Sequence, residues 1–527
     1  MSKNKSHVLL TGSSGFVGSA LQQRLIIDGN HVLTIAVRKV KKQSDNVCTV
    51  KVDDLKATTD WKNALKDIDV VIHAAARVHV MNDSATDPLT EFRKVNVEGT
   101  LNLARQAVEA GVKRFIFISS IKVNGEATEL DHPYTEDSKP NPIDPYGISK
   151  YEAEQGLLKL AETTSLEVVI IRPTLVYGEN VKGNFRSLMK WTNKGIPLPI
   201  AGIKDNLRSL VSLNNLTDFV ITCIDHPNAK NEVFLVADDD DISTADLLDE
   251  IAKGLGVKNK AVNIPPQLIN RTAAALGKSG VAQRVSGSLQ VDISKSKNLL
   301  GWKPKHSVSE SIQETAKFYK LNLTNRKSMA LQRPLDIAFS ATGLVAASPL
   351  LIGTTIVGYF DTGSPLFIQE RVGKDQKPFK LIKFRTMNVN TESVASHLAN
   401  SASITKFGTF LRKSKIDELP QLVNVLKGDM SLTGPRPNLY NQRELIEERQ
   451  ALGVYDVLPG ITGLAQLSNI DMSTPELLAK TDKRMIDSMS IRTYFSYILR
   501  TALGKGSGDA VKVIAEKDKQ KLINSNT

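Results

Sequence analysis

The sequence predicts an α/β chain in which a doubly wound parallel sheet is followed by a re-entrant membrane helix and a second folded domain. Through the first 320 residues, short apolar runs alternate with amphipathic helical stretches, as in a parallel sheet covered by helices. From Ile337 to Phe360 the chain then has 24 consecutive uncharged residues, a length that can enter a bilayer. A Ser348-Pro349 pair interrupts that run near its middle.

The bulk composition excludes several classes of protein. With 41% hydrophobic and 24% charged residues over 527 positions, the chain is neither disordered nor largely embedded in a membrane. Two cysteines are too few for a disulfide framework, and the first residues lack a secretory signal, so we expect a cytosolic first domain. Net charge is +12, and from Leu321 onward 27 Lys plus Arg face 19 Asp plus Glu. Basic residues beside an apolar segment indicate membrane lipids and phosphorylated substrates, and no nucleic acid.

A glycine-rich turn follows the first predicted strand. The strand begins at His7, and Gly12, Gly15 and Gly18 precede an amphipathic helix. Glycines at this spacing let the backbone turn sharply, approach a pyrophosphate and pack the helix on the strand, while the helix start offers free N–H groups to the anion. The pattern predicts a Rossmann-type dinucleotide site, and a glycine turn without a ligand is the alternative.

The end of the second predicted strand indicates which dinucleotide is bound. A site selective for NAD places an acidic residue there, on the ribose hydroxyl. This chain has Ala36 at that place, followed by Arg38 and Lys39, which suit a 2′-phosphate. The sequence therefore favours NADPH over NAD, with a solvated basic loop as the alternative.

A tyrosine and a lysine one helical turn apart form the predicted catalytic centre of the first domain. The ammonium of Lys150 can lower the pKa of Tyr146, so that this phenol exchanges a proton near neutral pH. Ser120, at the end of a predicted strand, adds a hydroxyl that can hold a substrate oxygen beside Tyr146.

Six segments of the first 320 residues together resemble the extended short-chain dehydrogenase/reductases that act on nucleotide sugars. These segments are Thr11–Gly18, His73–Ala75, Ile118–Ser120, Tyr146–Lys150, Arg172-Pro173 and Tyr177-Gly178. The resemblance implies a small substrate domain beside the sheet. It also implies that Tyr146 gives or takes the proton, that Lys150 assists it and contacts the ribose, and that Ser120 binds the substrate oxygen.

The same resemblance assigns binding roles. Asp54 contacts adenine, and Asn184 and Arg208 hold the sugar diphosphate of a UDP-sugar. Arg208 has the stronger physical case, because a guanidinium matches a phosphate in two-point geometry. Asn124-Gly125 stands where the usual epimerase has Tyr-Gly, and it looks more like the 4-keto-reductases that make UDP-N-acetylquinovosamine. Reduction is therefore favoured over 4-epimerisation, since an exchangeable NADPH suits net reduction.

The uncharged run is predicted as a helix that enters the membrane and turns back. Proline removes an amide donor and disfavours helix at the preceding residue, so a bend at Ser348-Pro349 is expected. Basic residues flank both ends of the run, which agrees with both ends remaining cytoplasmic. Asp336, just before the run, is expected at the lipid interface, paired with Arg333 or a later basic residue.

Two adjacent carboxylates, Asp417 and Glu418, are the candidate centre of the second domain. Held with a divalent cation, two acids can supply one nucleophile and one metal ligand, and Mg²⁺ is the expected partner of diphosphates. Taken alone, such a pair is usually a solvated helix terminus. Three motifs, Lys383–Met387, Asp417–Gln421 and Gly434–Pro437, closely resemble the bacterial sugar transferases called small monotopic phosphoglycosyl transferases.

This second resemblance implies a re-entrant helix, a mainly helical phosphoglycosyl transferase domain and a reaction in two steps. Asp417 attacks the sugar-bearing phosphate of a UDP-sugar, UMP leaves, and polyprenyl phosphate then takes the phosphosugar, while Glu418 binds Mg²⁺ or assists proton movement. Cations must offset the repulsion between the nucleophile and the diphosphate. The candidates are Lys383, Arg385 and Arg436.

The sequence thus predicts a bifunctional enzyme at the inner, cytoplasmic membrane, monotopic and with both domains on the cytoplasmic side. The first domain finishes a UDP-sugar and the second loads its phosphosugar onto the lipid carrier. The expected segments are a reductase/epimerase domain at 1–320, a linker at 321–333, the re-entrant helix at 334–360, the transferase domain at 361–510 and a polar tail at 511–527.

Three other hypotheses stay open at this stage. The first domain is a UDP-N-acetylhexosamine 4-epimerase with tightly held NAD, or it is a nucleotide-sugar-binding regulatory module without turnover. The third treats the second half as a lipid anchor alone. Assembly into a homo-oligomer is also left open by the sequence.

Overall fold

The computed structural model describes residues 5–39, 47–78, 87–275, 277, 283, 285–389 and 403–504. The chain divides into two compact units, Met1–Lys320 and Leu321–Thr527. The predicted polar tail at 511–527 lies outside the described residues.

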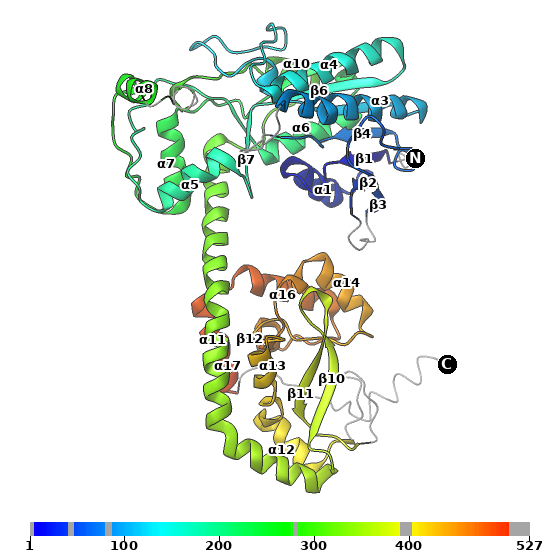
Figure 1. The fold of residues 1–527 in the computed structure, drawn as a ribbon, viewed down its shortest axis with the longest axis vertical. Helices are drawn as coiled ribbons and strands as arrows, with labels where there is room; N and C mark the ends of the chain where they lie inside the picture. The colour runs from blue at the N-terminus through cyan, green and yellow to red at the C-terminus, as the bar shows by residue number, and fades with distance from the viewer. Residues whose placement is uncertain are drawn as a thin grey trace. The chain divides into compact units, whose positions relative to one another are not determined.

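Seven parallel strands form the sheet of the first unit, in the order β3-β2-β1-β4-β5-β6-β9 (Figure 1). Their bounds are β1 His7–Thr11, β2 Val32–Val37, β3 Cys48–Lys51, β4 Val70–His73, β5 Arg114–Ile118, β6 Glu167–Pro173 and β9 Glu232–Val236. The order runs outward from β1 in both directions, which confirms the predicted doubly wound sheet. In such sheets ligands bind at the carboxyl ends of the strands, where the order reverses.

Helices cover both faces of this sheet. On one face lie α1 (Phe16–Asp28) and α6 (Leu213–Asp225), and on the other lie α3 (Thr100–Glu109) and α4 (Pro145–Thr163). The side chains of β1 alternate accordingly, since Val8 and Leu10 join the first core and Leu9 joins the second. Because helices cover both faces of the sheet, side chains on both sides of each strand are buried, and the strands are continuous apolar runs in the sequence. Shorter helices connect the layers: α2 Pro88–Phe92, η1 Arg93–Gly99, η2 Ile121–Val123 and η3 Pro227–Ala229.

A smaller lobe accompanies the sheet, as the sequence predicts. It contains β7 (Leu175–Tyr177), which pairs with β8 (Leu210–Ser212), and the helices α5 (Gly183–Asn193), α7 (Thr244–Leu255) and α8 (Pro266–Ala275), whereas α10 (Ser294–Leu300) packs beside β9 of the main sheet. Its apolar core is separate from the two beside the sheet and includes Tyr177, Phe185 and Ile251. The aromatic rings of Tyr177 and Phe185 stack at 5.3 Å between centres.

The long helix α11 spans Val308–Thr362, so the segment 321–333, predicted as a linker, is helical. Polar and basic composition does not by itself end a helix, and the helix includes Pro334 and Pro349. In Figure 1 the ribbon of α11 turns sharply in its last part, within the second unit. Proline causes such kinks, because it lacks the amide donor of a regular helical hydrogen bond. Residues Leu331–Thr362 are long and apolar enough to cross a membrane, with a mean hydropathy of 1.7.

The second unit continues with a hairpin and a mainly helical body, as predicted. The hairpin pairs β10 (Leu366–Val372) with β11 (Pro378–Phe384), and the body has one short parallel pair, β12 (Ser431–Thr433) and β13 (Gly460–Thr462). The helices are η4 Lys374–Gln376, α12 Lys406–Ser414, η6 Ile416–Glu418, α13 Gln421–Lys427, α14 Arg443–Ala451, η7 Val454–Asp456, α15 Leu464–Leu467, α16 Pro475–Asp487 and α17 Ile491–Ala502.

Asp336, expected at a lipid interface, is instead buried in the second unit, with 1% of its surface exposed. Its Oδ1 accepts hydrogen bonds from the backbone N–H of Leu432 (3.0 Å) and from the hydroxyl of Tyr494 (2.8 Å). Arg333 donates instead to the carbonyls of Val425 and Leu426. These bonds connect the start of the apolar helix to β12 and α17, so a polar anchor fixes α11 to the helical body of the second unit.

Candidate functional site

Of the three glycines in the turn after β1, Gly12 and Gly18 stand where a side chain does not fit. Gly12 has φ +73°, and a Cβ there would lie 2.6 Å from the backbone nitrogen of Ala75. A Cβ on Gly18 would meet the carbonyl group of Gly12. The N–H of Gly15 donates to the Gly12 carbonyl at 2.8 Å, and no side chain caps the start of α1. The amino end of α1 therefore lies at the carboxyl end of β1, where the sheet order reverses.

The residues predicted to determine whether NADPH or NAD binds lie at the end of β2. Ala36 is buried in the strand, while Arg38 and Lys39 are exposed just after it. The guanidinium of Arg38 donates to Asp54 at 3.0 Å, and both side chains are largely exposed. Two residues that the sequence assigned to different parts of the cofactor thus form one exposed ion pair.

Lys150 is held under the carboxyl end of β5. Asp144 accepts a hydrogen bond from the N–H of Gly147 and so caps α4, which places Lys150 in its second turn. The ammonium donates to the carbonyl of Ile118 at 2.8 Å and lies 4.4 Å from the centre of the Phe117 ring. Burial lowers the pKa of Lys150 from 10.5 to about 7.

Tyr146 lies one turn before Lys150 on α4, with its ring centre 6.0 Å from the lysine ammonium. Burial raises the pKa of its phenol, and the nearby Asp144 carboxylate raises it further. The lowered phenol pKa that the spacing predicts is therefore not what this arrangement gives. A polar cofactor or substrate at the phenol would change that balance, because burial is the largest cause of the shift.

Ser120 begins the η2 turn two residues after β5. Its hydroxyl accepts a hydrogen bond from the N–H of Lys122 at 3.3 Å, and the side chain is partly exposed. Because Lys150 is bonded to the carbonyl of Ile118, the serine and the lysine lie at the end of the same strand. The structure thus brings the predicted catalytic residues to one edge of the sheet.

A buried ion pair that the sequence analysis missed lies beneath this edge. Arg172 donates to both carboxylate oxygens of Glu154, at 2.6 to 3.2 Å, and both side chains are almost fully buried. Ser119 also donates to Glu154, and Arg172 donates to the amide oxygen of Asn124 at 3.0 Å. Asn124, used above to distinguish a reductase from an epimerase, is therefore part of this buried network.

The two predicted diphosphate residues differ in their surroundings. Asn184 is exposed in the first turn of α5. The guanidinium of Arg208 donates to the carbonyl of Gly287 at 2.9 Å, and burial lowers its pKa from the ordinary value. Part of the Arg208 side chain thus holds the smaller lobe together.

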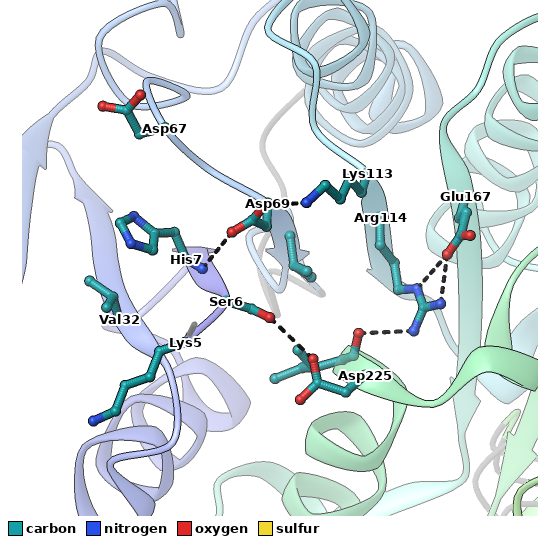
Figure 2. A pocket seen from close by; sticks show the side chains of 12 residues that line it. Lys5, Ser6, His7, Val32, Asp67, Asp69, Lys113, Arg114, Glu167 and Asp225 are labelled. Atoms are coloured by element: carbon teal, nitrogen blue, oxygen red, sulfur yellow. Dashed lines mark hydrogen bonds and ion pairs between the residues drawn. The ribbon is translucent and has the colours of Figure 1, made fainter. Parts of the chain in front are cut away.

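A large hollow of about 700 Å³ lies at the opposite edge of the sheet. Figure 2 shows its lining, where Lys113 bonds to Asp69 and Arg114 bonds to Glu167. These residues precede or begin the strands, whereas the glycine turn and Ser120 follow them. Since ligands of such sheets bind at the carboxyl ends, this hollow is not assigned to the predicted chemistry.

In the second unit, Asp417 lies in the short turn η6 between α12 and α13. Lys415, at φ +56°, ends α12 and redirects the chain, so that Asp417 is buried with 4% of its surface exposed. The adjacent Glu418 accepts a hydrogen bond from the guanidinium of Arg436 at 2.9 Å. The structure thus joins two of the three recognised motifs in one place.

The third motif reaches this region from β11, which packs against η6. Lys383 is almost buried, and its ammonium lies 5.7 Å from the centre of the Phe367 ring. The guanidinium of Arg385 lies 5.4 Å from the same ring and donates to the carbonyl of Ser364 at 3.0 Å. Both cations therefore face the Phe367 ring of β10, and Lys383 belongs to the strand that packs against the turn of Asp417.

A metal site of protein ligands alone does not form among the described residues, where no three His, Cys, Asp or Glu side chains gather around one point. Asp417 and Glu418 supply carboxylate oxygens of the kind Mg²⁺ binds, together with substrate phosphates, in diphosphate sites. The donor set therefore fits a magnesium ion that is completed by substrate.

The two units match two protein families. Residues 8–237 match the NAD dependent epimerase/dehydratase family, and residues 327–505 match the bacterial sugar transferases. The chain is 48% identical over 324 residues to a UDP-glucose 4-epimerase of Vibrio cholerae, which covers 62% of this chain and 98% of that protein. It is 42% identical over 130 residues to a putative undecaprenyl-phosphate N-acetylgalactosaminyl 1-phosphate transferase of Bacillus subtilis, which covers 24% of this chain and 72% of that protein.

A solved structure gives the same result for the fold of the first unit. A UDP-glucuronic acid 4-epimerase from Bacillus cereus, in complex with NAD, superposes with a TM-score of 0.50 at 22% identity and covers 60% of this chain and 98% of that one. The chain is thus a fusion that belongs to the NAD dependent epimerase/dehydratase family through its first unit and to the bacterial sugar transferase family through its second.

Proposed function

We propose that the chain is a bifunctional enzyme of surface glycan biosynthesis. The first unit reduces a UDP-4-keto-6-deoxy-N-acetylhexosamine to UDP-N-acetylquinovosamine or a close relative, with NADPH. The second unit transfers the sugar-1-phosphate to polyprenyl (undecaprenyl) phosphate and releases UMP. The observation that carries the proposal is the joining of Asp417, Glu418 and Arg436 in a unit of the sugar transferase family, fused to a nucleotide-sugar unit.

The second unit acts by covalent catalysis. A carboxylate oxygen of Asp417 bonds to the phosphorus of the sugar-bearing phosphate, the bond to the bridging oxygen breaks, and UMP leaves. An oxygen of polyprenyl phosphate then attacks the same phosphorus and frees Asp417. Arg436, held 2.9 Å from Glu418, supplies positive charge beside the attacked phosphate, and Lys383 and Arg385 add to it. Mg²⁺, when bound, neutralises phosphate charge and stabilises the leaving group.

The first unit acts by proton transfer at C4 of the sugar. Tyr146 gives a proton to the C4 oxygen, Ser120 binds that oxygen, and Lys150 stabilises the phenolate that remains. The hydride chemistry is that of the nicotinamide cofactor. The exposed Arg38 and Lys39 after β2, with no acid at Ala36, support NADPH as the cofactor. Asp54, Asn184 and Arg208 are the proposed contacts to adenine and to the sugar diphosphate.

A second candidate for the first unit is 4-epimerisation of a UDP-N-acetylhexosamine with tightly held NAD. Two observations favour it. The relative from Vibrio cholerae that is 48% identical is named a UDP-glucose 4-epimerase. In addition, Asn124 has a structural reason of its own, because its amide oxygen accepts a hydrogen bond from the buried Arg172. Both candidates need the same Tyr146 and differ in whether turnover consumes the reduced cofactor.

We place the enzyme at the inner membrane, with both units on the cytoplasmic side. The apolar segment Leu331–Thr362 supports contact with lipid. In its most apolar stretch, only 11% of the residues are buried within the protein. Pro349 within that segment supports a helix that turns back. A site that stays at the membrane surface can reach the phosphate of a lipid carrier and a UDP-sugar from the cytosol.

The test is one reaction with the full chain. UDP-N-acetyl-4-keto-6-deoxyglucosamine, NADPH, Mg²⁺ and polyprenyl phosphate are supplied, and the lipid product is identified by mass. We expect NADPH oxidation, UMP release and polyprenyl diphosphate-linked N-acetylquinovosamine. Tyr146→Phe should abolish the first step and Asp417→Asn the second. Unchanged UMP release by Asp417→Asn would reduce the second unit to a lipid anchor. Bound NAD with turnover that spares NADPH would replace reduction by epimerisation.

A further inference from the structure

The loop that carries Arg436 is held through its backbone carbonyls. Four successive carbonyls, from Pro435 to Asn438, each accept a hydrogen bond. The donors are the N–H of Gly460 for residue 435 (2.9 Å), the guanidinium of Arg449 for 436 (2.7 Å), the guanidinium of Arg371 for 437 (3.4 Å) and the N–H of Val372 for 438 (3.0 Å). They come from β13, α14 and the end of β10, so three separate elements fix one loop.

The prolines explain why this loop is fixed through carbonyls. Pro435 and Pro437 flank Arg436 and have no N–H group, so the loop cannot be secured by a regular ladder of amide donors. Their rings also fix φ on both sides of Arg436, which leaves the carbonyls as the groups that neighbouring elements can bind. A donor aimed at the carbonyl of residue 436 therefore sets the direction in which the Arg436 side chain leaves the loop.

Arg449 is that donor, and it is almost fully buried, with 1% of its surface exposed. Its Nη1 donates to the Arg436 carbonyl and also to the side-chain oxygen of Asn438 at 2.9 Å. Its Nε and Nη2 both donate to Oδ2 of Asp482, at 3.0 and 2.7 Å. One guanidinium thus joins Asp482 of α16 to two points of the loop, at residues 436 and 438, and only a planar, forked group does this.

Stability alone does not explain a buried pair of an arginine and a carboxylate, since apolar side chains of similar volume often replace such pairs without loss of folding stability. The contacts of Arg449 have a specific effect here, because they fix the loop that places Arg436 at Glu418. Asn438 is itself fixed by the hydroxyl of Tyr455, which donates to the same oxygen at 2.9 Å. The network therefore orients the loop rather than merely filling the core.

We propose that Arg449, oriented by Asp482, is a positioning residue for phosphosugar transfer and acts through the loop that presents Arg436. The inference rests on the proposed function of the second unit. Neither residue touches substrate in this scheme. Loss of Arg449 should therefore lower the rate of the step that Arg436 assists, and it should do so only while Arg436 is present.

The experiment measures UMP release by the full chain with UDP-sugar, Mg²⁺ and polyprenyl phosphate. We expect Arg449→Lys and Asp482→Asn to lower kcat about ten- to a hundredfold, with KM for the UDP-sugar within about threefold of wild type, because transition-state contacts appear in kcat. In an Arg436→Ala background, Arg449→Lys should cost less than about twofold more, since residues that act through one another are not additive.

Two further variants separate positioning from folding. Tyr455→Phe removes only the hydroxyl on Asn438, and we expect a smaller fall in kcat with normal folding. Lys483→Gln removes only an exposed ion pair with Asp487 on α16, the helix that carries Asp482, and is the matched control with kcat near wild type. The inference would be overturned if Arg449→Lys kept the kcat of wild type. It would also be overturned if Arg449→Lys lowered kcat by the same factor in the Arg436→Ala background as in wild type. Either result would leave the proposed function standing. A wild-type chain that releases no UMP would overturn the proposed function and the inference with it.

Discussion

Arg436 and Glu418, eighteen positions apart in the chain, form an ion pair of 2.9 Å in the second unit, and Glu418 directly follows the candidate nucleophile Asp417. Both side chains of the pair are largely but not fully buried. The pair fixes the guanidinium at the turn where the diphosphate of the donor would be attacked. One oxygen of Glu418 is engaged by this contact, and a carboxylate has further acceptor sites that can serve a metal ion.

This pairing predicts different effects for two conservative changes. Arg436→Lys keeps the charge but loses the forked geometry, so we expect UMP release to fall about ten- to a hundredfold. Glu418→Gln keeps the hydrogen bond but loses the charge that binds Mg²⁺ or moves a proton, and the fall should be at least about a hundredfold. Glu476→Gln, in an exposed pair with Lys480 on α16, is the control and should keep normal turnover. Equal activity of Glu418→Gln and wild type would contradict the assignment of Glu418.

The buried pair of Glu154 and Arg172 predicts a large effect on the stability of the first unit. Glu154→Gln leaves the Arg172 guanidinium buried without its counter-charge, which should cost about 3 to 5 kcal/mol. The three tryptophans, at 61, 191 and 302, all lie in the first unit, so tryptophan fluorescence during urea unfolding reports on that unit alone.

The matched control is Glu152→Gln on the same helix, which removes an ion pair with Arg93 at the surface. Exposed pairs contribute little, so its unfolding midpoint should stay close to that of wild type. A Glu154→Gln variant with an unchanged midpoint would mean that the buried network does not support the sheet edge that carries the candidate catalytic residues.

The lowered pKa of Lys150 predicts how stability changes with pH. In the folded chain this pKa is about 7, whereas its ordinary value is 10.5, so between these values the unfolded chain binds more protons and stability rises with pH. Lys150→Met lacks this contribution. The free energy of unfolding of wild type, relative to Lys150→Met, should therefore rise from pH 7 to pH 9.5 at up to about 1.4 kcal/mol per pH unit.

Tryptophan fluorescence in urea measures this difference at several pH values. Other titrating groups are common to both proteins and cancel in the comparison. If the difference stayed constant from pH 7 to pH 9.5, burial would not lower the pKa of Lys150.

The ion pair of Arg38 and Asp54 predicts the outcome of a cofactor test. Arg38→Ser should raise KM for NADPH about tenfold and leave KM for NADH within about twofold, because the guanidinium suits the 2′-phosphate only. Lys113→Ser, at the opposite edge of the sheet, is the control and should change neither value. A parallel rise of both KM values would show that Arg38 holds a part shared by the two cofactors.

The sequence predicted the features that depend on local patterns. Gly12, Gly15 and Gly18 lie within one turn, and the spacing of Tyr146 and Lys150 is one turn of one helix, so both sets can be recognised without the fold. The alternation of apolar runs predicted the doubly wound sheet for the same reason, since the pattern of a parallel strand is local.

The features that the sequence did not predict join distant parts of the chain. Arg449 and Asp482 are 33 positions apart, and Asp336 and Tyr494 are 158 apart. A charged residue that will be buried carries no local mark that distinguishes it from a surface residue. Glu154 had a weak signal, because it is one turn from Lys150 and adjoins Ala153 in the buried face of α4. The helical conformation of the predicted linker at 321–333 could not be told from its polarity, because polarity does not interrupt a helix.

The proline inside the apolar part of α11 predicts how the chain sits in the membrane. Pro349 lies within the uncharged run, and its missing amide and its ring favour a bend there. Pro349→Ala should favour a straight helix that spans the bilayer, which would place the second unit outside the cytosol. Pro334→Ala, before the uncharged run, is the matched control and should leave the topology unchanged.

Single cysteines at exposed positions of each unit, in a chain with Cys48 and Cys223 replaced by serine, report the topology in intact cells. A reagent that does not cross membranes should label neither unit of the wild type or of Pro334→Ala until the inner membrane is opened. In Pro349→Ala the cysteine of the second unit should become reactive in cells with an intact inner membrane, and lipid-linked product should be lost. If the reagent labelled either unit of the wild type in cells with an intact inner membrane, that unit would lie outside the cytosol. This result would contradict the placement of both sites on the cytoplasmic side, where UDP-sugars and NADPH are supplied.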